Sequence, residues 1–257
     1  MKKFVLFLLF GLIFAAPAHS TTVEHEFTVI IGPFDASRTM FSYSLNKASY
    51  KIESTVRTAG MFNTLYPFRA DYMTSGNINN GKLQTRHYYY RSKSRFNRRS
   101  KELVYNEKGM PVYRISSKND KEKKVAIEES PDNVGTTDLQ TVFAALSKQY
   151  NDVKFCDSRM QVFDGKRRFD VIIKDEGKEE ISAGQYSSFH GTAAKCSMYI
   201  DKLNSKDDDM LWELTSERPI YFWILEEQGH PFIARVMVEN TPLGRLDAYT
   251  SKVTIKE

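Results

Sequence analysis

From Val23 onward, long stretches of the chain alternate apolar and polar residues with a period of two. Between 39 and 45 the odd positions hold Thr, Phe, Tyr and Leu, and Ser occupies two of the even positions. Between 50 and 57, Tyr50, Ile52 and Val56 alternate with polar residues. This alternation places the apolar side chains on one face, which is typical of half-buried antiparallel strands.

Short turn motifs separate these runs. Asn-Asn-Gly at 79–81, Glu-Lys-Gly at 107–109 and Asp-Gly at 164–165 each join two strand-like segments. They predict β-hairpins, because Gly tolerates the positive φ that tight turns need. Further strands are predicted at 194–201, 210–214, 220–226, 232–239 and 245–255. The polar segment 117–124 is predicted to be a mobile hairpin end, and 117–136 is the best candidate for a division between two halves.

One amphipathic helix interrupts the strands. Thr137-Asp138 offers an N-cap, and Leu139, Val142 and Leu146 follow at helical spacing up to about 150. A lone helix in a strand-rich chain covers or plugs a sheet. The pattern therefore predicts a mainly β fold, an antiparallel spiral or open β-barrel with one principal helix at about 138–150, formed by a single domain over 19–257.

The N-terminus carries an export pattern. Lys2 and Lys3 precede an apolar run at 4–16, which ends in the small-x-small motif Ala-Pro-Ala at 16–18. The run is shorter than the roughly 20 residues of a membrane-spanning helix, so a cleavable signal peptide over 1–18 is favoured over an uncleaved anchor. Removing both lysines lowers the formal charge from +5 to +3. We expect a periplasmic protein without a transmembrane segment after cleavage.

Cys156 and Cys196 are the two cysteines of the chain. In an exported protein such a pair is expected to form a disulfide, which would close a loop of about 40 residues. A redox or metal-binding pair is the alternative. The close C-x-x-C spacing and neighbouring His ligands that this alternative needs are missing.

Basic and aromatic residues are interleaved between 86 and 101. The pattern favours the solvated basic face of a hairpin, which also opposes edge pairing. The alternatives are binding of single-stranded nucleic acid, or of an anionic lipid head group or polysaccharide. Because exported proteins rarely meet nucleic acid, an anionic envelope ligand is the preferred binding hypothesis. Its candidate residues are Arg86, Arg91, Lys93, Arg95, Arg98 and Arg99.

Candidate catalytic and metal-binding residues do not form recognised patterns. Ser187-Ser188 and His190 lack a nucleophile elbow, and the acidic run 207–209 lacks the Gly and the distal Glu of a calcium loop. No metal or cofactor is predicted. Two apolar runs, at 61–68 and 221–225, are interpreted as core, or alternatively as the lining of an apolar cavity.

The second half resembles a family of exported proteobacterial proteins classed as a domain of unknown function. The resemblance rests on the V-F-D-G-K-R-R hairpin at 162–168 between the two cysteines, and on the run Pro-Leu-Gly-Arg at 242–245. By kinship with envelope-integrity proteins, it implies a periplasmic spiral β-barrel that wraps a helix and contains a disulfide. The family has no assigned catalytic residues, so none is carried over.

Three functions are compatible with these features. The first is a non-enzymatic envelope-integrity factor that shelters a lipid or another apolar ligand in a half-open barrel. The second is a protein–protein interaction module with a filled core. The third is an envelope polysaccharide or peptidoglycan hydrolase, which would need two converging carboxylates or a Ser/His pair.

Overall fold

Fourteen β-strands dominate the computed structural model, which describes residues 20–203 and 214–256. The described ranges also contain the helices α1 (Gly60–Leu65) and α2 (Leu139–Val153) and the short 3-10 turn η1 (Pro131–Asn133). The strands are β1 (Thr21–Ile31), β2 (Phe34–Leu45), β3 (Ser49–Thr58), β4 (Phe68–Asn79), β5 (Lys82–Ser94), β6 (Arg98–Tyr105), β7 (Pro111–Lys118), β8 (Lys121–Ala126), β9 (Ser158–Phe163), β10 (Arg168–Ile181), β11 (Gly191–Lys202), β12 (Ile220–Glu227), β13 (His230–Thr241) and β14 (Gly244–Lys256).

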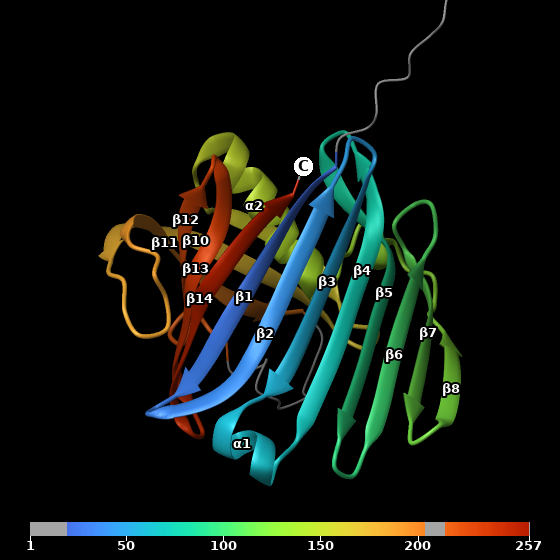
Figure 1. The fold of residues 1–257 in the computed structure, drawn as a ribbon. Helices are drawn as coiled ribbons and strands as arrows, with labels where there is room; N and C mark the ends of the chain where they lie inside the picture. The colour runs from blue at the N-terminus through green and yellow to red at the C-terminus, as the bar shows by residue number, and fades with distance from the viewer. Residues whose placement is uncertain (1–19, 204–213, 257) are drawn as a thin grey trace, which may run out of the picture.

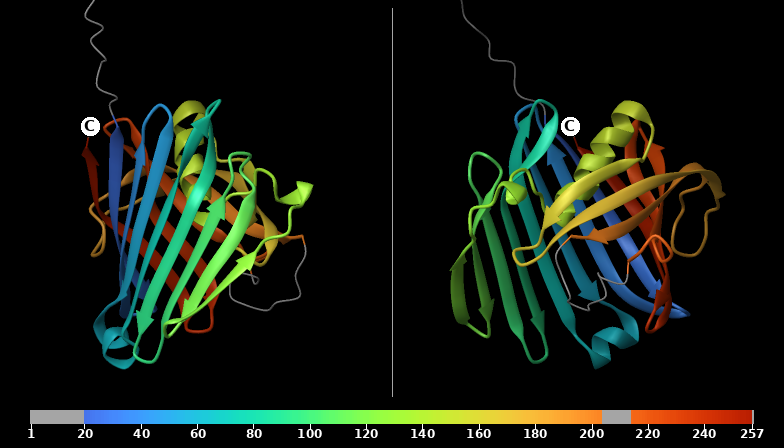
Figure 2. Two further views of the ribbon diagram at one scale, coloured as in Figure 1. Left: turned by 90° about the vertical axis from the view of Figure 1, so that its right-hand side faces the viewer. Right: turned by 180° about the vertical axis from the view of Figure 1, so that it is seen from behind.

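The strands form one antiparallel sheet in the order β8-β7-β6-β5-β4-β3-β2-β1-β14-β13-β12-β11-β10-β9. The first strand pairs with the last, so that Val23 lies opposite Ile255. The sheet curls strongly but does not close, and β8 and β9 are its two edges (Figure 1, Figure 2). The predicted mainly β fold, an open barrel with one principal helix, is confirmed.

The helix α2 lies inside the curved sheet (Figure 2). It begins at the predicted N-cap, where the Asp138 side chain accepts hydrogen bonds from the backbone N–H groups of Gln140 and Thr141. It ends where Lys154 adopts a left-handed conformation. Val142 and Leu146 pack into the core against β9–β12, and Ala144 joins the cluster of β1–β3. The helix therefore links the two walls of the barrel.

The turn of the β9–β10 hairpin crosses to the other side of the opening. Lys101 Nζ donates to the Asp164 carbonyl oxygen at 3.1 Å, and an Arg114 guanidinium nitrogen donates to the Gly165 carbonyl oxygen at 2.8 Å. Lys101 belongs to β6 and Arg114 to β7. The hairpin predicted from Asp164-Gly165 thus braces the open side of the barrel without completing a hydrogen-bonded ladder.

The polar segment 117–124 is more regular than predicted. It forms the β7–β8 hairpin, whose turn residues Asn119 and Asp120 have positive φ values of 50° and 66°. A Lys-rich, exposed strand suits the edge of a sheet, because charged side chains oppose pairing with other chains. The sequence pattern underestimated this strand because it has almost no apolar face.

The two apolar runs behave differently. Phe222, Trp223 and Ile224 in β12 are all buried, as expected for a strand covered on both faces. In contrast, Met61, Leu65 and Tyr66 in and after α1 are exposed, and Phe62 and Phe68 are only half-buried. No residue of the run 61–68 is buried, so the prediction that it forms core is wrong. The predicted signal peptide, the acidic run 207–209 and most of the predicted strand 210–214 lie outside the described residues.

Candidate functional site

Four of the six predicted anion-binding residues line one surface hollow of about 480 Å³ on β4–β6: Arg91, Lys93, Arg98 and Arg99. We call this the basic hollow. Arg91 and Lys93 lie two residues apart on β5 and share a face, and Arg98 pairs with Lys93 across the β5–β6 ladder. The alternation of the strand and the short turn therefore bring Arg91, Lys93 and Arg98 together on one face, whereas Arg99, paired with Ser92, points to the other face.

Arg86 and Arg95 are not among the residues that line this hollow. A register shift between β4 and β5 occurs next to Arg86, and its guanidinium donates to the Asn106 carbonyl oxygen instead. Arg95 lies in the turn between β5 and β6. The clustering of all six residues in the sequence therefore does not correspond to one cluster in space.

Arg69 of β4 also lines the hollow, although the sequence interpretation did not include it. It lies opposite Lys93 in the β4–β5 register, a neighbour that a correct hairpin alignment through the 79–81 turn would have revealed. Asp71 accepts from Arg69 at 2.9 Å and from Arg91 at 3.2 Å. Partial burial raises the pKa of Asp71, but these hydrogen bonds outweigh it and hold that pKa below its ordinary value.

The basic hollow has an excess of positive charge. Its lining contains five cations and two carboxylates, Asp71 and Asp120, and Asp120 pairs with Arg98. Lys93 forms no ion pair with any described residue. Guanidinium groups bind phosphate and carboxylate through two parallel hydrogen bonds, and Tyr89 adds an aromatic surface beside them. The arrangement is suited to an anionic group of moderate size.

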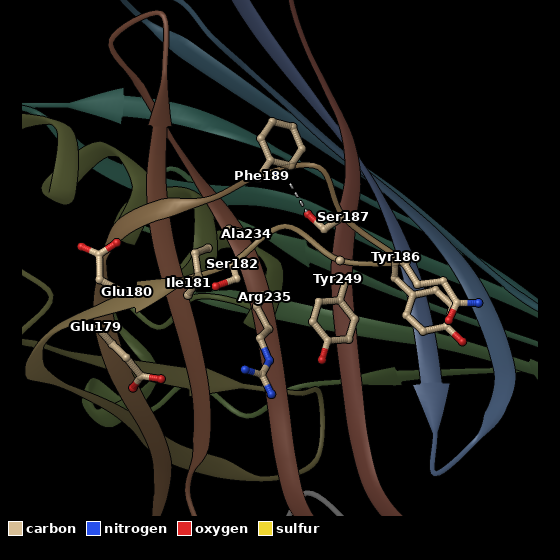
Figure 3. A pocket seen from close by; sticks show the side chains of 12 residues that line it. Glu179, Glu180, Ile181, Ser182, Tyr186, Ser187, Phe189, Ala234, Arg235 and Tyr249 are labelled. Atoms are coloured by element: carbon tan, nitrogen blue, oxygen red, sulfur yellow. Dashed lines mark hydrogen bonds between the residues drawn. The ribbon is translucent and has the colours of Figure 1, made fainter.

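A second hollow, of about 310 Å³, lies under the segment that joins β10 to β11 (Figure 3). This segment crosses β13 and β14, where the Tyr186 ring stacks on Tyr249 with centroids 6.0 Å apart. Arg235 faces the hollow, but its guanidinium is bound to the Asp247 carboxylate at 2.6 Å. The Arg235 guanidinium therefore stabilises the fold rather than presenting a free positive charge to this hollow.

Ser187, Ser188 and His190, which the sequence pattern did not assign to catalysis, lie in the same segment without forming a catalytic pair. Ser187 Oγ accepts a hydrogen bond from the Phe189 N–H at 3.3 Å (Figure 3). His190 Nδ1 lies 3.2 Å from the Ser188 carbonyl oxygen. Within residues 20–203 and 214–256, no hydrogen bond joins His190 to a serine hydroxyl. These contacts provide no activated nucleophile.

The most buried polar cluster surrounds Asp138 at the start of α2. Its carboxylate accepts from Thr74 at 2.8 Å, from Thr85 at 3.0 Å and from the Thr141 hydroxyl at 2.7 Å. Tyr50 joins the same network through Thr85 and Thr141. A buried carboxylate whose acceptor sites are filled in this way is a structural anchor, and it fixes the helix to β3, β4 and β5.

The buried side chain of His25, unlike that of Asp138, lies in an apolar environment. It is 2 % exposed, lies among the rings of Phe27, Phe41, Tyr43 and Phe232, and neither ring nitrogen has a hydrogen-bond partner. Burial lowers the pKa of His25 from 6.5 to about 4. The imidazole is therefore neutral at physiological pH and acts as part of the core.

The described part of the chain contains no group of three or more His, Cys, Asp or Glu residues placed to hold a metal ion. Cys156 and Cys196 are joined by a disulfide, with their Cα atoms 6.2 Å apart. Both cysteines are fully buried in the core beside α2, so the bond ties the end of the helix to β11. Within the same residues, no helix has both the length and the apolar character to cross a bilayer.

Comparison with known proteins supports the fold. A β-barrel-like protein of the domain of unknown function DUF1849 from Brucella abortus has a similar structure, with a TM-score of 0.51 and 8% sequence identity. The match covers 93% of this chain and 98% of that one. No curated protein matches in sequence. Residues 26–249 match the family described as "Protein of unknown function (DUF3108)", so the chain belongs to this family.

Proposed function

We propose that this member of the DUF3108 family is an exported, non-catalytic protein of the cell envelope that binds an anionic envelope component in the basic hollow. The observation that carries the proposal is the convergence of Arg69, Arg91, Lys93 and Arg98 around one surface hollow of about 480 Å³. Export is supported by the signal-peptide pattern at 1–18 and by the cysteine pair.

The packing inside the barrel favours binding at the surface over shelter of an apolar ligand inside. The side of α2 that faces β9–β12 is packed against Val162, Val171 and Phe222. At the N-terminus of α2, the polar network of Asp138 occupies the space between the helix and strands β4 and β5. Neither of the two hollows described above is lined by a residue of α2. An interior ligand would have to displace these contacts.

A binding role fits the chemistry better than a catalytic one. The buried Asp138 has its acceptor sites filled, and the Asp71 and Asp120 carboxylates of the basic hollow are paired with arginines. Paired carboxylates hold the guanidinium groups in place, which favours recognition of a fixed anion. A hydrolase would instead need one carboxyl group kept protonated or one free to act as a base.

The proposal is tested by titrating the protein with soluble dihexanoyl-phosphatidylglycerol and with polygalacturonate, followed by calorimetry. These probes carry phosphate and carboxylate groups, respectively. The double variant R91E/R98E is expected to bind at least about tenfold more weakly, because two charge-assisted contacts are lost. Both side chains are exposed, so the fold is expected to survive the change.

The matched control is K47E/K108E. It makes the same change in net charge with two exposed lysines in the turns at the opposite end of the strands. The control is expected to bind like the wild type. The proposal is wrong if the wild type binds neither probe, or if the control loses as much affinity as R91E/R98E.

A further inference from the structure

Large apolar side chains are exposed at one end of the barrel, the end that carries α1. We call this group the apolar rim. Phe96 and Tyr66 are 78% and 71% exposed, values that are unusual for aromatic residues in a structured turn. The members of the apolar rim are Phe34, Met61, Leu65, Tyr66, Phe96 and Leu243.

The antiparallel topology places all six residues at the same end. Four strands run toward this end: β1, β3, β5 and β13. The connections after β3, β5 and β13 carry five of the six side chains, and Phe34 begins β2 directly after the turn that follows β1. Figure 1 shows these connections, with α1 among them, along the lower margin of the barrel. Contacts between α1 and β2, with a hydrogen bond from the Ala59 N–H to the Ala36 carbonyl oxygen, bring α1 close to the start of β2.

The strand connections at the opposite end differ from the apolar rim, although Val153 and Phe155 at the end of α2 are exposed at that end too. There, Lys154 pairs with Glu226 at the end of β12. The connections between strands have the sequences Asn-Lys-Ala at 46–48, Asn-Gly at 80–81 and Asn-Glu-Lys-Gly at 106–109. No large apolar side chain in these turns is exposed. Single exposed apolar residues are normal on protein surfaces, but their concentration at one end of an otherwise polar set of turns is not.

Basic residues flank the apolar rim. Segments 91–99 and 118–122, which surround the β5–β6 and β7–β8 turns at this end, contain seven cations and two carboxylates. Phe96 lies directly between Arg95 and the Asn97-Arg98-Arg99 run. The basic hollow opens on β4–β6 next to these turns. The apolar rim matches the acyl chains of a lipid surface, and the neighbouring cations match its anionic head groups.

We propose that the apolar rim docks this protein on the surface of an anionic lipid bilayer. Phe96, Tyr66 and Leu65 enter the boundary between head groups and acyl chains. Arg95, Arg98 and the basic hollow contact the phosphate groups, since long cationic side chains reach head groups while neighbouring apolar side chains insert. The inference rests on the proposed function and names a lipid surface as the source of the anion.

The experiment uses protein purified from the periplasmic fraction of an expressing host, with its N-terminus read by mass spectrometry. Co-sedimentation is measured with phosphatidylcholine vesicles with and without phosphatidylglycerol. Wild-type protein is expected to bind the anionic vesicles. L65S/F96S is expected to reduce the partition coefficient by about tenfold or more, because two large side chains no longer leave water.

Two further variants sharpen the test. V153S removes an exposed apolar side chain from the end of α2, away from the apolar rim, and is expected to bind like the wild type. Because the chain already has two tryptophans, F96W is compared with the wild type: the emission added at position 96 is expected to be blue-shifted and to be quenched by brominated lipids. Circular dichroism establishes that each variant is folded.

The outcomes separate this inference from the proposed function. If L65S/F96S binds anionic vesicles like the wild type, or if brominated lipids leave F96W unquenched, the rim does not insert and the inference is overturned. Binding of the soluble anions would then still stand. If R91E/R98E retains the soluble anions but L65S/F96S loses the vesicles, insertion of the apolar rim stands, and the assignment of the basic hollow as the phosphate contact is overturned.

Discussion

The Asp138 carboxylate and the Thr85 hydroxyl, 53 residues apart in sequence, are joined by a 3.0 Å hydrogen bond that is buried from solvent. This contact connects the N-terminus of α2 to β5. Because the same carboxylate also caps the helix, one side chain determines both where the helix starts and where it sits.

Asp138→Ala is therefore expected to lower the free energy of unfolding by about 3 kcal/mol, the sum of a lost cap and of buried hydroxyl groups left without acceptors. Urea denaturation measures the change. Asp152→Ala in the same helix breaks an exposed pair with Lys148 and is expected to cost less than about 0.5 kcal/mol. Equal effects of the two changes would contradict the anchoring role of Asp138.

Cys156→Ser is expected to lower the free energy of unfolding by about 3–4 kcal/mol under oxidising conditions, because the disulfide closes a long loop in the unfolded chain. The two cysteines are separated by 40 residues. Thermal unfolding with and without reductant checks this expectation. A melting temperature that does not change in the variant would show that the bond contributes nothing to stability.

His25 makes stability depend on pH. Burial lowers the pKa of His25 in the folded protein from 6.5 to about 4. Between these pH values the imidazole is protonated in the unfolded chain and neutral in the folded protein. The stabilisation is complete above pH 6.5 and is lost as pH falls from 6.5 toward 4, by about 3 kcal/mol in total. Unfolding curves across this range should show that His25→Leu loses less stability on acidification than the wild type. Parallel pH profiles would rule out this assignment.

Gly165 combines a positive φ of 91° with a close neighbour, since a Cβ there would lie 2.7 Å from Leu103 Cδ2. Gly177 has a similar φ of 89° but nothing within 4 Å of a Cβ position. Gly177→Ala therefore measures the backbone cost alone, about 1 kcal/mol. Gly165→Ala is expected to cost clearly more in urea denaturation, because the hairpin must move away from β6. If the two variants lose equal stability, the β9–β10 turn is not held against β6.

The fold could be predicted from the sequence because its strands have the regular alternation and turn motifs that local physics favours. The helix start at Asp138 and the Asp164-Gly165 hairpin were visible for the same reason. β8 was underestimated because a Lys-rich edge strand has no apolar face to detect. The contact of Asp138 with Thr74 and Thr85 could not be found locally, since it depends on how the sheet curls.

The candidate site was only partly predictable. Arg91, Lys93, Arg98 and Arg99 line one hollow because they lie in one hairpin, and their role in anion binding stays a prediction. Arg86 was grouped with them only by proximity in sequence, and the register shift beside it was not apparent. The apolar run at 61–68 was interpreted as interior because hydrophobicity alone does not distinguish core from an exposed binding surface.

The pairing of β1 with β14 has a consequence for how the chain folds. Val23 and Ile255 are opposite each other, so the N-terminal strand has its second neighbour only after nearly the whole chain has been synthesised. Until then one side of β1 is an unpaired edge, open to association with other chains. Folding dominated by such distant contacts is slow. The rate-limiting step is therefore expected to be the pairing of β14, in the last hairpin β13–β14, with β1 of the sheet formed earlier by the N-terminal strands.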